Sequence, residues 1–525
     1  MHEFIARHKD RIIGTLSGFD RLVFRGTLRS IAYPDGMQGY LRSNGILLKD
    51  FGQHVERVRA DIKQASLNHA VTMGRPVQYL SSSATSKEAL ARQIASDDGV
   101  REGLIAVLTC VEPCRTFDIY RNRQEKKLEL VARERKCLFL YHYWFDPVFG
   151  FMNARIQTWF PFPIQVCLNG REWLARQMDG QGMKYLAADN CFPWIEQWDR
   201  AQQLMDTQLR TEWPQVLDRI ASQLDPIHDT VFQKHPVRYY WSTYQHEWAI
   251  DVAFDDADYL RRLYPRLIHH GITTFGSSDV LRYLGKRTPL SGEVPWNFAG
   301  EVTATLRERE EGVRIKHVVN NNSLKLYDKA FTTMGSTLRA ETTLQNTRDL
   351  RVYRPKEGDP NGPCSWRPLR RGIADLYRRA ELSQKATERY LDAYASIEDS
   401  TTFEQLVMRI ERPASWRGRR VRSLRPFNDD RPLLAAIARA EFDLTGFRNR
   451  NLQELLFSAA PRSGREARRR SAWVSRQLRL LRAHGLITKI NGTHRYRLTR
   501  VGRTMTTAIL AALRATVRQL MPAAA

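Results

Sequence analysis

The stretch 312–344 reads GVRIKHVV (312–319), NNN (320–322), SLKLYDKAF (323–331), TTMGS (332–336) and TLRAETTL (337–344). Its three longer runs mix β-branched and apolar residues with polar ones at a spacing of two, which is typical of half-buried strands. The asparagines at 320–322 are typical of a tight turn, because asparagine tolerates a positive φ angle. The stretch therefore predicts three strands that run antiparallel to one another.

Two more strand-like runs lie before it, VRYYWSTYQ (237–245) and HEWAIDVAF (246–254). A helix is predicted over 256–269, and Asp256 and Asp258 favour its N-terminal end because carboxylates interact well with the positive end of a helix dipole. Residues 237–354 are therefore expected to form an antiparallel sheet domain with a helix.

Changes in composition divide the rest of the chain. GLIAVLTC (103–110) predicts a buried strand and 51–67 has helical spacing, so 1–136 is expected to be an α/β domain. Strands and helices packed on the core are expected over 137–236. Four prolines and two glycines in 355–368 begin a loop and helical linker over 355–425. The predicted fold class is α+β, with a mainly antiparallel sheet core and a separate domain over 426–525.

That last domain is predicted to be a winged helix-turn-helix. RPLLAAIARAEF (431–442) predicts a helix with Pro432 near its start, and Asn449 is the predicted N-cap of a second helix. A basic loop (461–470) precedes a third helix, which Ser471 opens and Gly485 ends. LITKI and HRYRLT, joined by Asn491-Gly492, predict a hairpin. The segment GLITKINGTHRYRLTRVGR (485–503) resembles the wing of MarR-like DNA-binding domains.

Positive charge is concentrated in the same region. The 525 residues carry 82 Lys and Arg against 57 Asp and Glu, and from Pro461 onward 15 bases face one acid, Glu466. Such a basic segment predicts a nucleic-acid partner, with DNA expected and RNA left open, bound through the third helix in the major groove. The expected contacts are Arg468, Arg469, Arg470, Arg476, Arg479, Arg482, Lys489, Arg495 and Arg497.

Other classes of protein are disfavoured. No apolar run reaches the ~18 residues of a membrane span, and the N-terminus lacks the apolar core of a signal peptide. Six cysteines in this length do not make a disulfide scaffold, so a reducing compartment is expected. We therefore expect a bacterial cytoplasmic protein without a membrane partner. Its oligomeric state is left open.

The middle sheet contains a candidate catalytic cluster. Period-two alternation places Lys325, Tyr327 and Lys329 on one face of their strand. A tyrosine flanked by lysines suits attack on a phosphodiester, because the lysines favour the phenolate and bind the phosphate. The candidate ligands of a Mg²⁺ or Mn²⁺ ion are Asp251, Glu341 and Asp255, and the ion is expected only if the sheet is catalytic.

The order of these motifs resembles plasmid rolling-circle replication initiators and their phage relatives. The resemblance rests on Asp251-Val-Ala-Phe-Asp255-Asp256, Leu326-Tyr327-Asp328-Lys329 and Arg339-Ala-Glu341. It implies a metal-dependent nuclease that nicks one DNA strand through its tyrosine and stays joined to the 5′ phosphate. The His-hydrophobe-His metal motif of many such proteins is missing here. The whole chain also resembles a widespread bacterial family with a winged-helix tail, which implies no mechanism.

Two alternatives remain beside a DNA-nicking protein of the replication-initiator or transposase type. The first is a non-catalytic protein, either a transcriptional regulator or an RNA-binding component of a ribonucleoprotein. The second is an RNase-H-like nuclease of a mobile element, with Asp20 and Glu112 as its catalytic carboxylates. Whether the protein is an enzyme is thus left open by the sequence.

Overall fold

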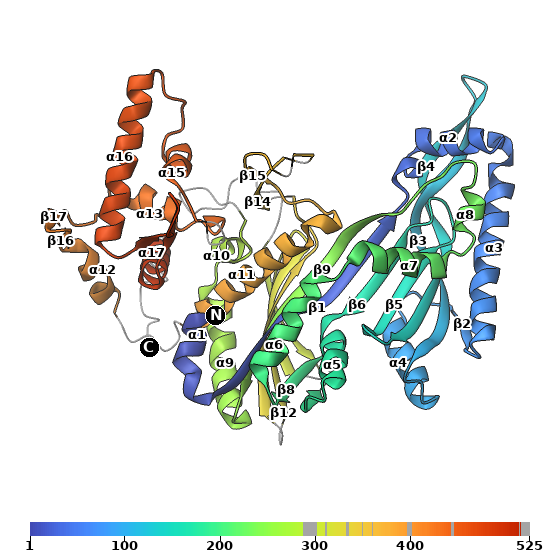
Figure 1. The fold of residues 1–525 in the computed structure, drawn as a ribbon, viewed down its shortest axis with the longest axis horizontal. Coiled ribbons are helices and arrows are strands. Elements are labelled where there is room, and N and C mark those ends of the chain that lie inside the picture. Colours follow the sequence, from blue (N-terminus) through green and yellow to red (C-terminus); the bar gives the residue numbers. More distant parts are fainter. Residues whose placement is uncertain are drawn as a thin grey trace. The chain divides into compact units, whose positions relative to one another are not determined.

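A computed structural model describes residues 1–515, except for 189, 287–301, 310–311, 332–334, 349, 357, 360, 396–401, 443–445 and 514. The internal contacts divide the chain into two units. Unit 1 comprises Met1–Ile13, Phe254–Leu369 and Glu381–Ala525, and unit 2 comprises Gly14–Ala253 and Arg370–Ala380. The fold class is α+β, as predicted (Figure 1). No helix in the described part of the chain combines the length and the apolar character needed to cross a bilayer.

Unit 2 is built on long strands in the order β9-β1-β6-β5-β4-β3-β2. Each pair of neighbours in the run β1-β6-β5-β4-β3 is antiparallel. The edge strand β2 is parallel to β3, which makes the sheet mixed. The predicted buried strand at 103–110 is the first half of β3. The strands of unit 2 are β1 (Ile12–Thr27), β2 (Val77–Leu80), β3 (Gly103–Asn122), β4 (Lys127–Asp146), β5 (Gly150–Gln157), β6 (Ile164–Asn169), β7 (Tyr185–Ala188), β8 (Cys191–Ile195) and β9 (Tyr240–Phe254).

Helices in unit 2 connect and cover these strands. The helical spacing predicted over 51–67 corresponds to α3, whose buried side chains Val55, Val58 and Ile62 recur every three or four residues. The helices are α2 (Pro34–Ser43), α3 (Phe51–Thr72), α4 (Lys87–Asp97), α5 (Gly170–Gly180), α6 (Trp198–Thr207), α7 (Trp213–Leu224) and α8 (His228–Val231).

Unit 1 contains the predicted strands of the middle of the chain as one antiparallel set, β10-β11-β12-β13. Asn320 and Asn321 form the predicted turn, with φ angles of 48° and 64°. One face of this set packs on α9, where the Tyr264 hydroxyl donates to the carbonyl of Leu326 at 3.0 Å. The elements are α1 (His2–His8), α9 (Ala257–Thr274), α10 (Ser277–Tyr283), β10 (Thr303–Arg309), β11 (Gly312–Val319), β12 (Asn322–Phe331), β13 (Gly335–Leu344), β14 (Arg351–Arg354), β15 (Ser365–Pro368) and the part of α11 (Leu376–Tyr394) from Glu381 onward.

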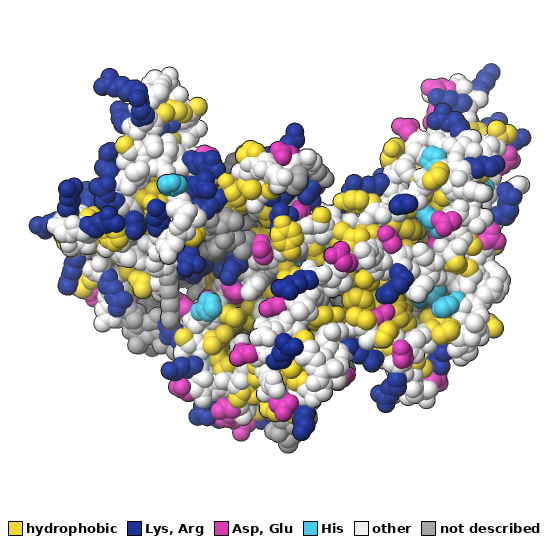
Figure 2. Space-filling view, in the orientation of Figure 1, with side chains coloured by type: hydrophobic (Ala, Val, Ile, Leu, Met, Phe, Trp, Pro, Cys, Tyr) yellow, Lys and Arg dark blue, Asp and Glu magenta, His cyan; other side chains and the backbone are white. Residues whose placement is uncertain are grey.

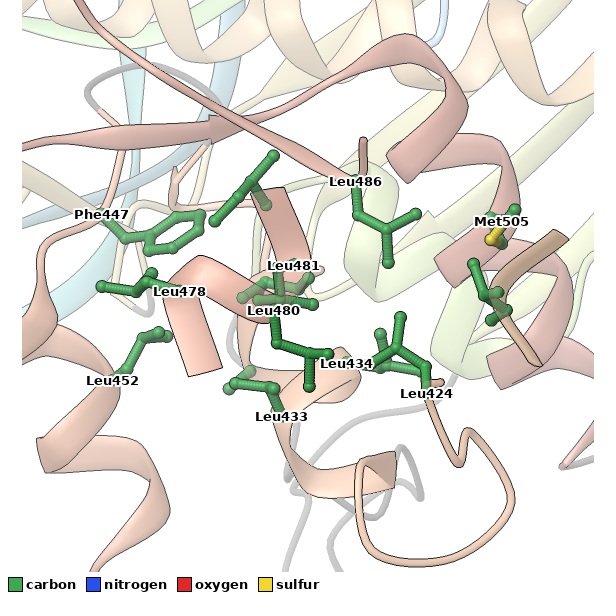
Figure 3. Close-up of a cluster of buried hydrophobic side chains, with 14 of the residues drawn as sticks. Leu424, Leu433, Leu434, Phe447, Leu452, Leu478, Leu480, Leu481, Leu486 and Met505 are labelled. Atoms are coloured by element: carbon green, nitrogen blue, oxygen red, sulfur yellow. The ribbon is translucent and has the colours of Figure 1, made fainter. Parts of the chain in front are cut away.

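The C-terminal elements of unit 1 share one hydrophobic core (Figure 3). Leu433 and Leu434, Leu452, and Leu478 and Leu481 come from three different helices, and all are buried. The elements are α12 (Phe403–Glu411), β16 (Ala414–Trp416), β17 (Arg419–Val421), α13 (Arg431–Ile437), α15 (Asn449–Leu456), α16 (Gly464–Ala483), β18 (Ile487–Lys489), β19 (Tyr496–Leu498) and α17 (Arg500–Ala512).

Local details here differ from the sequence-based expectations. Arg448, not Asn449, is the N-cap of α15, and the Asn449 amide instead donates to the Ser471 carbonyl at 2.9 Å, which ties α15 to α16. Six residues, not a two-residue turn, separate β18 from β19, because Lys489 pairs with Tyr496. Gly485 does follow the third helix, with a φ angle of +71° that favours glycine.

We predict that Leu481→Ala loosens this core by about 2–5 kcal/mol, because a fully buried leucine is replaced by a cavity. Hydrogen–deuterium exchange of the full chain, read in peptides from α13 and α16, measures the change. Val501→Ala on the exposed side of α17 is the control and should alter exchange by under ~0.5 kcal/mol. Equal exchange in the wild type and Leu481→Ala would show that the core does not hold these helices together.

Candidate nucleic-acid interface

Helix α16 is longer than the sequence analysis expected. The basic loop predicted over 461–470 is largely helical, since α16 begins at Gly464 and not at Ser471. The reason is a cap about two turns earlier, where the Ser463 hydroxyl accepts from the Glu466 backbone N–H at 3.2 Å. Glu466 in turn accepts from the backbone N–H of Arg462 at 2.8 Å and pairs with Arg470. Twenty residues make a rod about 30 Å long.

The longer helix aligns five arginines on one face. At 100° per residue, Arg465, Arg468, Arg469, Arg476 and Arg479 fall in a sector of about 100°, opposite the buried Val474, Leu478 and Leu481. We call these five residues the arginine stripe. All five are exposed, and none forms a salt bridge or hydrogen bond with another residue in the described ranges. The stripe is about 21 Å long, and its middle position is the small residue Ala472.

The other predicted contact residues divide into two groups. Lys489 and Arg497 are exposed on the β18–β19 hairpin. Three arginines are half-buried and engaged within the protein. Arg470 pairs with Glu466 and lies over the ring of Phe457, Arg482 lies over Trp416 at 4.7 Å, and Arg495 lies over Tyr353 at 4.4 Å.

The candidate catalytic residues of the middle sheet do share one face. In the register of β12 and β13, Lys325 is opposite Glu341, Tyr327 is opposite Arg339, and Lys329 is opposite Thr337. From β11, Arg314 and Lys316 join this face, because they are opposite Tyr327 and Lys325. The face is not the solvent-exposed surface that a phosphodiester nucleophile needs, since Lys325, Lys329, Arg339 and Glu341 are buried and Tyr327 is half-buried.

The charges on this face do not activate the tyrosine. Burial is the main reason why the pKa of Tyr327 is raised to about 12, with Glu341 adding to the effect and Lys325 and Arg314 opposing it. Lys325 is bound to Glu341 in a buried ion pair, so its charge is largely compensated. Burial works to raise the pKa of Glu341, but Lys325 outweighs it and the pKa is lowered.

The predicted metal ligands are engaged in other ways. Asp251 belongs to unit 2, where it is buried and accepts from Arg171 at 2.9 and 3.1 Å. Asp255 belongs to unit 1 and is exposed, with Arg11 at 3.9 Å. Because Asp251 is neutralised by Arg171, its position does not favour it as a ligand of a Mg²⁺ or Mn²⁺ ion, whereas the ligand role of Glu341 stays a prediction.

Asp20 and Glu112, the alternative carboxylates, both lie in unit 2. Glu112 is bound by Lys87 at 3.0 Å, Arg155 at 3.2 Å and the Tyr141 hydroxyl at 2.7 Å. Asp20 accepts from Asn190 at 3.1 Å, and one of its oxygens lies within 4.8 Å of a Glu247 oxygen. Asp20 lines a pocket of about 420 Å³, and Glu112 is not among the described residues that line it.

Sequence reasoning missed two sets of basic residues. Arg465 was placed in a loop, although Ser463 followed three residues later by Glu466 is the pattern of a helix N-terminus. Arg417, Arg419 and Arg420 fall in the predicted loop and helical linker over 355–425, whereas the structure folds them into the β16–β17 hairpin. The dipeptide Arg417-Gly418 was the available turn signal.

Comparison with known proteins identified no relative of this chain. No family model, no curated protein and no solved structure matches the chain. The resemblances to MarR-like domains and to rolling-circle initiators therefore remain predictions that rest on the quoted motifs.

The buried Lys325–Glu341 pair makes a testable contribution to stability. Lys325→Met leaves the Glu341 carboxylate buried without its cation, so we expect a loss of about 3–5 kcal/mol in urea unfolding at pH 7. Because the pKa of Glu341 is lowered in the folded state, the contribution of the pair is present above the carboxyl's ordinary pKa and is lost as the pH falls through the lowered value. The difference between the two proteins should therefore shrink below about pH 4.

Lys316→Met is the matched control, because Lys316 lies opposite Lys325 and burial and Lys325 together lower its pKa. Its removal should leave stability unchanged or raise it. A Lys325→Met protein as stable as the wild type at pH 7 would contradict the role of the pair.

Proposed function

We propose that the protein binds duplex nucleic acid through a C-terminal winged helix-turn-helix in which α16 is the recognition helix. The single observation that supports this most is the arginine stripe. Helices α13, α15 and α16 followed by the β18–β19 hairpin have the order of a winged helix, with α17 added after the wing. DNA is the expected duplex, and RNA is the alternative.

Electrostatics favour a polyanion over a protein partner at this face. Neighbouring arginines three or four residues apart repel one another by about 0.2–0.5 kcal/mol per pair, and the stripe contains three such pairs. Glu466, the one acid in α16, forms its salt bridge with Arg470, which is outside the stripe. Lys and Arg side chains gather over α16 and the β16–β17 hairpin in Figure 2. Phosphates spaced along a duplex would neutralise the stripe and release counterions, which contributes most of the affinity in such complexes.

Geometry also suits a groove. The major groove is about 12 Å wide and admits one α-helix. Ala472 lets the helix backbone come close at the centre of the stripe, while Arg465 to Arg469 on one side and Arg476 and Arg479 on the other reach outward. Lys489 and Arg497 on the hairpin add two exposed charges beside the helix. Three further arginines contact partners within the protein, so we assign them to stabilising the fold and not to binding the duplex: Arg470, Arg482 and Arg495.

Replacing Arg476 and Arg479 by alanine tests this function. The double variant should bind a duplex ~10–100-fold more weakly at moderate salt, and the slope of log K against log[salt] should fall by about two. A fluorescence anisotropy titration of the full chain at four salt concentrations measures both quantities. Arg121→Ala with Arg123→Ala removes two exposed arginines from the end of the β3–β4 hairpin and serves as the control.

No duplex binding by the wild type would reject the proposed function. An equal loss in the control would show a general effect of net charge and no interface at α16. The same titration with RNA duplex distinguishes the two nucleic acids.

A second candidate is the DNA-nicking activity, and one observation favours it. Tyr327, Lys325, Lys329 and Glu341 do lie on one sheet face in the predicted order. The raised pKa of Tyr327 and the cation-bound carboxylates work against it at neutral pH. If the tyrosine does act, the protein must first deprotonate it, so the rate should keep rising with pH up to about 12.

Tyr327→Phe should then abolish nicking of supercoiled DNA in Mg²⁺ or Mn²⁺, together with any protein joined to a 5′ phosphate. Denaturing gels with labelled DNA detect both products. Tyr79→Phe changes an exposed tyrosine in unit 2 and should cut normally. If the wild-type protein gives neither nicked DNA nor an adduct, the nicking activity is rejected and only duplex binding stands. If Tyr327→Phe is fully active, this tyrosine is not the nucleophile.

A further inference from the structure

The segment between α12 and α13 forms a tight hairpin. Trp416 of β16 pairs with Arg419 of β17, and the two residues between them, Arg417 and Gly418, have φ angles of 49° and 74°. Two successive positive φ angles are those of a type I′ turn, the connection that best matches the twist of two strands. The hairpin therefore holds its side chains in a defined arrangement.

Helix α16 anchors this hairpin. The guanidinium of Arg482 lies 4.7 Å from the centre of the Trp416 ring, and the His484 ring bonds to the carbonyl of Arg422 at 2.9 Å. Val421 packs against the C-terminal hydrophobic core, and Leu424 is part of that core. The hairpin is thus fixed beside the C-terminal end of the helix that carries the arginine stripe (Figure 1).

The described residues do not balance the charge of the hairpin. Residues 412–425 contain six arginines and no acid. The two that follow the hairpin are neutralised, because Arg422 binds Asp430 through two bonds of 2.7 Å and Arg425 pairs with Asp429 at 3.2 Å. The other four are exposed, and no described residue forms a salt bridge or hydrogen bond with their side chains: Arg412, Arg417, Arg419 and Arg420.

We propose that the β16–β17 hairpin is a second phosphate-binding element, which holds the backbone of the same duplex that α16 binds. This inference rests on the proposed function and extends it to a surface outside the winged helix. Arg419 shares a hairpin face with Trp416, Arg420 lies on the other face, and Arg417 is at the tip, so the three point in different directions. Such a set suits the phosphates around one backbone, which position a protein without reading sequence.

The test is the triple variant Arg417→Asn, Arg419→Gln and Arg420→Gln in the full chain. Asparagine at 417 keeps the turn, because it tolerates the positive φ angle. Duplex affinity should fall ~10–100-fold, the slope of log K against log[salt] should fall by about three, and the loss should be the same on unrelated sequences.

The chain offers a closely matched control at the end of the β3–β4 hairpin. Arg121→Gln, Arg123→Gln and Lys126→Asn remove three charges from another exposed hairpin, in which Lys126 also has a positive φ angle, of 51°. This variant should bind within about twofold of the wild type, because only the loss of general charge affects it.

The outcomes separate the two proposals. If Arg476→Ala with Arg479→Ala weakens binding and the hairpin variant does not, the hairpin proposal is wrong and the function of α16 stands. An equal loss in the β3–β4 control also overturns the hairpin proposal. If the wild type binds no duplex, both fall. A loss confined to one DNA sequence would assign base recognition to the hairpin in place of backbone contact and would overturn the proposal as stated.

Discussion

The division of α16 into two faces is the constraint on which the C-terminal part of the chain depends. Val474, Leu478 and Leu481 bury one face against α13 and α15 and fix the rotation of the helix about its axis. That rotation leaves the five arginines of the stripe on the outside, where they repel one another. Burial of apolar side chains, worth about 1.5–3 kcal/mol for each leucine, easily exceeds the repulsion between exposed arginines. Packing of the core therefore outweighs the repulsion and keeps the five arginines together on the surface, where they can bind an anion.

Sequence reasoning predicted the elements well where the pattern was local. The strands at 312–344, the Asn320-Asn321 turn, the helix after Asp256 and the glycine that follows α16 all depend on neighbouring residues, and the structure has each of them. It failed where a cap or a turn competed with composition. A run of arginines looks like a loop, yet Ser463 and Glu466 start a helix there. The predicted linker has few apolar residues near 417, yet Trp416 packs under Arg482 of α16 and Val421 packs against the C-terminal core, so a hairpin is held there.

The candidate catalytic face shows what alternation cannot predict. The shared face of Lys325, Tyr327 and Glu341 follows from the period of two, and the register confirms it. Burial and ion pairing depend on what packs against the sheet, which no single strand encodes. Lys325 forms a buried ion pair with Glu341, and Arg171 forms one with Asp251. Side chains whose types suggest catalysis therefore contribute to the stability of the fold. The same charges that suggested an active site therefore argue more strongly for a buried polar network.

The central claim is that the arginine face of α16 touches duplex nucleic acid. A photo-crosslinking amino acid placed at Ala472, in the middle of the stripe, tests it most directly in the full chain. Our account predicts a crosslink to a duplex of about 30 base pairs that is lost at high salt, and none from the same probe at Val71, an exposed position on α3. A crosslink from Val71 with none from position 472 would contradict the account.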